Sequence, residues 1–154
     1  MFSSLGLIGV AILFAFVGIV VAAIWTFFLG FAGIPGALVT TYFSERRPSG
    51  VGFAIGIVLT ILGQLALALI FVVLIAELTK TLIGASTGIG KWLLLSVSWL
   101  IASAPPWMAL KDAVAKRTET AYEDLQPGLK AQLSAPAFVA PISSLAFIVY
   151  YALR

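Results

Sequence analysis

Cysteine and histidine are both absent from this chain of 154 residues. Without them the chain has no thiol nucleophile, no disulfide, no serine–histidine couple and no zinc site built on either ligand. Histidine is also the side chain that enzymes use most often as a general acid or base. The sequence therefore predicts a protein that is not an enzyme and that holds neither a metal ion nor another cofactor.

Charged side chains are scarce, at 10% of the chain compared with roughly 25% in an ordinary globular domain. They are missing altogether from four long stretches, at positions 1–44, 48–76, 92–110 and 131–153. A helix of about 20 residues crosses the roughly 30 Å apolar layer of a bilayer, whereas a helix on the surface of a soluble domain needs a polar face. The pattern predicts an all-α, polytopic integral membrane protein that forms a single domain of four transmembrane helices.

The four spans are expected at about 4–29, 51–78, 89–106 and 136–153. The first charge-free stretch is too long for one span, because 44 helical residues would reach about 66 Å. Within it, the residues that favour a turn lie only at 30–36. We therefore expect residues 30–47 to form a short segment that lies at the membrane interface or re-enters the membrane. A five-span chain is the alternative. No Lys or Arg precedes the first apolar run, which predicts a retained span rather than a cleaved signal.

Residues 106–126 differ from the spans, because charged side chains separate apolar residues that recur every three or four positions. This spacing is typical of an amphipathic helix. Its basic and acidic residues nearly balance, whereas a segment that grips anionic lipid is usually basic. We therefore expect an interfacial helix that contacts a partner protein, although the third span can also continue through Pro105 and Pro106 as a bent helix. The expected partner contacts are Trp107, Lys116 and Arg117.

Small and polar residues recur at every fourth position along one face of the first span and one face of the second. Such residues let helix backbones approach closely in lipid. We expect the two faces to pack against each other inside the bundle, and the alternative is that they face a partner subunit. The predicted helix-packing residues are Gly18, Ala22, Thr26, Gly30, Gly52, Gly56, Thr60 and Gln64.

Gln64 is the only strongly polar side chain deep inside an expected span. An isolated amide in a membrane is usually an interhelical hydrogen-bond partner, worth about 1 kcal/mol. Since no charged groups accompany it, the sequence favours a non-catalytic accessory or scaffolding subunit of a larger membrane complex, or a small homo-oligomer. The alternative is a small transporter or channel that uses Gln64 and the helix break at 30–36, because broken helices often build binding sites in membranes.

The stretch 84–90 resembles the glycine-rich phosphate loops of nucleotide-binding enzymes. Those loops follow a β-strand and open a helix within a βαβ unit, but here an apolar helix of membrane length precedes the glycines. We therefore interpret the stretch as a turn between two spans that binds no nucleotide.

The distribution of Lys and Arg predicts the orientation of the chain. If the N-terminus is outside, six of the nine basic residues face the cytoplasm and three lie outside. The positive-inside rule favours this arrangement, so we expect a multi-pass protein of the cell (inner) membrane with both termini on the non-cytoplasmic side. The net charge of +3 is too small to indicate nucleic acid. The expected partners are the lipid bilayer and either other membrane subunits or further copies of the chain.

Overall fold

The fold is a bundle of long helices. The computed structural model describes residues 4–46, 50–84, 88–119 and 122–153, and no strand occurs among them. The elements are α1 (Ser4–Ala32), α2 (Ile34–Arg46), α3 (Gly50–Ile83), α4 (Ile89–Glu119), the 3₁₀ turn η1 (Tyr122–Asp124), α5 (Pro127–Ser134) and α6 (Pro136–Leu153). Within the described residues, four helical stretches are long and apolar enough to cross a membrane: Ile8–Arg46, Gly50–Ile83, Ile89–Glu119 and Pro127–Leu153. The predicted all-α membrane fold with four transmembrane helices is confirmed.

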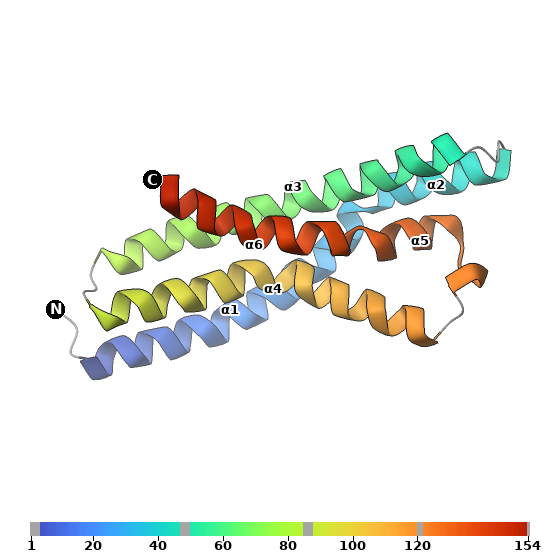
Figure 1. The fold of residues 1–154 in the computed structure, drawn as a ribbon. Coiled ribbons are helices and arrows are strands. Elements are labelled where there is room, and N and C mark those ends of the chain that lie inside the picture. The colour runs from blue at the N-terminus through green and yellow to red at the C-terminus, as the bar shows by residue number, and fades with distance from the viewer. Residues whose placement is uncertain (1–3, 47–49, 85–87, 120–121, 154) are drawn as a thin grey trace.

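α1 and α2 form one kinked helical stretch. A single turn residue, Gly33, separates them, and the amide of Ala37 still donates to the Gly33 carbonyl at 3.0 Å. Pro35 has no N–H, so the carbonyl four residues before it lacks a helical partner, and a kink at this point is the usual result. α2 then runs alongside the first half of α3 (Figure 1). The segment expected at the interface or re-entering the membrane is therefore, over 34–46, a helix packed on α3.

α4 continues through Pro105 and Pro106, and Figure 1 shows it changing direction about half-way along its length. Proline bends a helix because its ring clashes with the preceding turn. The amphipathic segment expected at 106–126 is therefore not a separate helix. Up to Glu119 it is the second half of α4, positions 120 and 121 lie outside the described residues, and η1 follows.

The bundle is elongated, and the beginning of α1 and the end of α6 lie at the same end of it (Figure 1). α1 packs along α4, α6 packs against both α3 and α4, and α5 lies against α2. The loop expected at 84–90 connects α3 to α4, with positions 85–87 outside the described residues. It therefore follows a helix rather than a strand, and Gly88 has a φ of 65°, which glycine adopts without strain.

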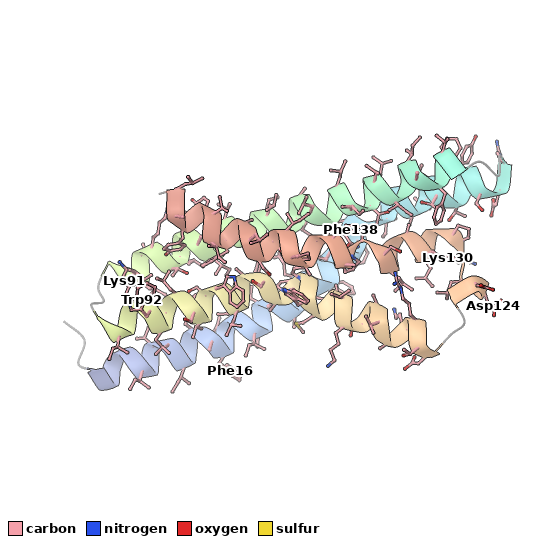
Figure 2. The ribbon with its side chains drawn as sticks, in the orientation of Figure 1. Phe16, Lys91, Trp92, Asp124, Lys130 and Phe138 are labelled. Carbon is pink, nitrogen blue, oxygen red and sulfur yellow. The ribbon has the colours of Figure 1, made fainter. Side chains whose placement is uncertain are left out.

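The core lies where α1, α3, α4 and α6 meet. Phe71 stacks on Trp25 with 5.0 Å between ring centroids, and the fully buried Ala22 belongs to the same cluster. The outer faces are also apolar: Phe16 is 69% exposed, and Figure 2 shows it on the outer side of α1. Lipid tails are as apolar as such side chains, so this exposure fits a bundle surrounded by lipid.

Candidate functional site

α2 and α3 approach so closely that their backbones are nearly in contact. A methyl group added to Gly36 would lie 2.6 Å from the Gly56 carbonyl oxygen, and one added to Gly56 would lie 2.9 Å from the Thr40 Cα. Gly52 faces the Phe43 side chain in the same way. Small residues therefore create this contact, as expected for helices packed in lipid.

The two small-residue faces do not pair with each other as we expected. The face that contains Gly52, Gly56 and Thr60 is covered by α2, because the kink at Gly33 directs the chain onto α3. The face on α1 packs on α4 instead. A methyl group on Gly18 would lie 2.8 Å from Ile101 Cγ1, and the Thr26 hydroxyl lies 3.4 Å from the Pro105 carbonyl oxygen.

Gly30 takes no part in helix packing. It is exposed, and a methyl group added there would meet no atom within 4 Å among the described residues. Three residues later, at the kink, the chain passes from packing on α4 to packing on α3. The regular four-residue spacing gave no sign of this change of neighbour.

Buried serine and threonine hydroxyl groups in the bundle are hydrogen-bonded within their own helices. Thr40 donates to the Gly36 carbonyl at 2.8 Å, and Thr60 donates to the Gly56 carbonyl at 2.9 Å. The same pattern holds for the other buried serines and threonines, Thr79, Ser98, Ser103, Ser143 and Ser144. These side chains are therefore satisfied without a ligand, whereas the buried Tyr151 hydroxyl has no hydrogen-bond partner among the described residues.

Gln64 lies at the kink between α1 and α2. Its side chain is only 4% exposed, and its Nε2 atom would lie 3.0 Å from a methyl group on Gly33. The structure therefore brings together the two features that the sequence suggested for a transport site, the helix break and the buried amide.

Two of the three expected partner contacts are links within the bundle. Trp107 Nε1 donates to Ser144 Oγ on α6 at 2.9 Å. Arg117 Nη2 donates to the Leu133 carbonyl and to Ser134 Oγ, both at 3.1 Å, and so joins the end of α4 to the end of α5. Lys116 is exposed and remains available for a partner. Sequence spacing could not reveal these links, because each joins residues at least sixteen positions apart.

A polar cluster at the opposite end joins α3 to α6. The Tyr150 hydroxyl donates to the Glu77 carboxylate, and Lys80 Nζ lies 3.1 Å from the same oxygen. Lys80 Nζ also lies 4.7 Å from the centre of the Tyr150 ring. The spacing of Glu77 and Lys80 indicates that they can pair, but the contribution of Tyr150 depends on the tertiary fold.

No group of three or more His, Cys, Asp or Glu side chains among the described residues is arranged to hold a metal ion. One groove, of about 590 Å³, lies between α1 and α4 and is lined mainly by apolar side chains. Comparisons with protein-family models, with curated proteins and with solved structures find no match for this chain.

Proposed function

We propose that this chain is a non-catalytic integral membrane protein that serves as an accessory or scaffolding subunit of a larger membrane assembly. The observation that supports this role is the interior of the bundle, in which the buried serine and threonine hydroxyls are bonded within their own helices. Such an interior supplies neither a reactive group nor a polar conduit. The broad apolar outer faces suit lateral association with lipid and with other membrane helices.

The partner contact is proposed at the charged end of the bundle, which comprises the end of α4 from Lys116 to Glu119, η1 and α5. Lys116 and Glu119 are exposed there, and Figure 2 shows Asp124 and Lys130 at the same end. Charges of both signs select a partner of complementary pattern and speed its encounter. Arg117 is assigned a structural role instead, because its guanidinium group holds α5 against α4.

Reversing the charge of Lys116 should release the partner. We expect Lys116→Glu to lose a protein that co-purifies stoichiometrically with the native chain in mild detergent, while the thermal stability of the bundle stays the same. An exposed charge contributes only about 0–1 kcal/mol to stability, whereas docking depends on complementary charges acting together. Lys91→Glu, an exposed lysine at the opposite end, is the matched control and should keep the partner. If the partner is a second copy, the same substitution halves the mass of the complex.

A small transporter is the second candidate, supported by the position of the buried Gln64 amide against Gly33 at the helix kink. The two candidates give different results with purified protein. Transport replaces the subunit role if two results are found together. The native chain elutes as a monomer without a partner, and vesicles that contain it show an ion flux that is lost in Gln64→Leu.

We also propose that both termini lie on the non-cytoplasmic side of the cell (inner) membrane. Four crossings return the chain to the side on which it began, and the excess of Lys and Arg lies at the other end. A reporter enzyme that is active only outside the cytoplasm should therefore be active when it is fused after the last residue. A reporter that is active only in the cytoplasm should be inactive there. Activity of a cytoplasm-specific reporter at this position contradicts the assigned orientation.

A further inference from the structure

The groove between α1 and α4 has the dimensions of a ligand site. Its volume of about 590 Å³ lies within the roughly 300–1,000 Å³ of typical small-molecule pockets. Ala15 and Ile19 form its α1 side, and α4 residues from Val97 to Lys111 form the other. The Ser103 hydroxyl in its wall already donates to the Trp99 carbonyl at 2.7 Å. The groove therefore offers an apolar surface along most of its length.

Two indole rings in the wall are held in place by α6. Trp99 Nε1 donates to the Ser144 carbonyl at 3.2 Å, and Trp107 Nε1 donates to Ser144 Oγ at 2.9 Å. Because the polar edges of both rings are satisfied by one residue of α6, the rings have no polar group left to offer an occupant. Their positions are fixed before any occupant binds, which lowers the entropy cost of binding.

Lys111 is the charged residue that lines the groove, and it ends the charge-free stretch 92–110. Val97 and Lys111 are fourteen positions apart, which corresponds to about 21 Å along a helix and exceeds the roughly 15 Å apolar depth of one leaflet. Asp112, the next residue, does not line the groove. The groove thus joins one cation, at the end of a charge-free run, to an apolar surface that extends along about four turns of α4.

We propose that this groove binds an anionic phospholipid, with one acyl chain along Trp99 and Trp107 and the phosphate at Lys111. The match is one of charge and polarity: an anionic head meets the ammonium group, and an acyl chain meets the apolar wall. A zwitterionic lipid can place a chain in the groove but gains less from the lysine. The lipid site is independent of the proposed partner contact, which lies at the end of α4 beyond Lys111.

Bromine atoms on an acyl chain quench the fluorescence of an indole ring that they touch, so the groove contains its own probes. The full-length chain carries Trp92→Phe and Trp25→Phe, so that the two indoles of the groove are the only ones left. It is placed in phosphatidylcholine vesicles with a minority of phosphatidylglycerol. The bromine is carried by one lipid or the other. We expect brominated phosphatidylglycerol to quench about five-fold more effectively per molecule, the factor that one lysine provides near an anionic lipid.

Two substitutions distinguish a lipid bound in the groove from surrounding lipids that merely contact the protein. Lys111→Gln should reduce the preference for phosphatidylglycerol to about one-fold, while Lys91→Gln, an exposed lysine at the other end, should retain it. Ala15→Leu, which fills the groove, should also remove the preference, and melting curves establish that each variant is folded. Equal quenching by the two lipids in the native groove, or a preference that survives Lys111→Gln, overturns the proposal. So does a lack of quenching by either lipid in a dimer, because a second copy then covers the groove.

Discussion

Replacing Gly36 with alanine should loosen α2 from α3 and lower the free energy of unfolding by about 3 kcal/mol, the upper part of the usual range for overpacked contacts. The added methyl group would lie 2.6 Å from the Gly56 carbonyl oxygen and close to the Thr60 amide nitrogen. Both are backbone atoms, so no side-chain rotation can relieve the clash and the two helices must move apart. Reversible unfolding in mixed detergent micelles measures the loss.

Gly30→Ala is the matched control for Gly36→Ala. It lies six residues earlier, and its added methyl group would have no neighbour within 4 Å in the described structure. Alanine is a better helix former than glycine by about 1 kcal/mol, so this variant should be as stable as the native chain or slightly more stable. A similar loss in both variants would mean that the helix itself, and not the contact with α3, is sensitive at these positions.

The four spans were predictable because charged side chains are excluded from the lipid layer more strongly than other residues. The course of the helices through their glycines and prolines was predicted only in part: a bent third span that continues through Pro105 and Pro106 was one of two open alternatives, whereas the kinked helix at Gly33 was not expected. The segment 30–36 and the pair Pro105 and Pro106 look like helix ends by the rules for soluble proteins. In a bilayer an unsatisfied backbone group is so costly that the chain remains helical and bends instead. This explains both the kink at Gly33 and the continuous α4.

The sequence predicts which small residues form close helix contacts, but not which helices these contacts join. Periodicity identifies the small-residue faces, and the face containing Gly56 and Thr60 does form a close contact. Which helix covers a face depends on where the chain bends, and the spacing of residues contains no such information. The roles of Arg117 and Trp107 also depend on α5 and α6, which come much later in the chain.

Replacing Phe71 with alanine should cost about 3 kcal/mol of stability, at the low end of the range for aromatic residues in soluble cores. The Phe71 side chain is 2% exposed and stacks on Trp25. Trp25 cannot readily move into the space, because its Nε1 atom donates to the Leu67 carbonyl at 3.1 Å. The gain from transfer out of water is absent in a membrane, where lipid is the alternative environment, but the lost packing contacts remain.

Ile70→Ala tests whether burial or merely side-chain size determines that loss. Ile70 precedes Phe71 on the same helix but is 53% exposed on the outer face, where it meets lipid rather than core. Lipid tails can fill the space that its side chain leaves, so we expect a change within about 0.5 kcal/mol, as for other substitutions on exposed surfaces. The same mixed-micelle unfolding measurement compares the two variants directly. A loss with Ile70→Ala as large as that with Phe71→Ala would contradict the assigned core, because stability would then follow side-chain size on both faces of α3.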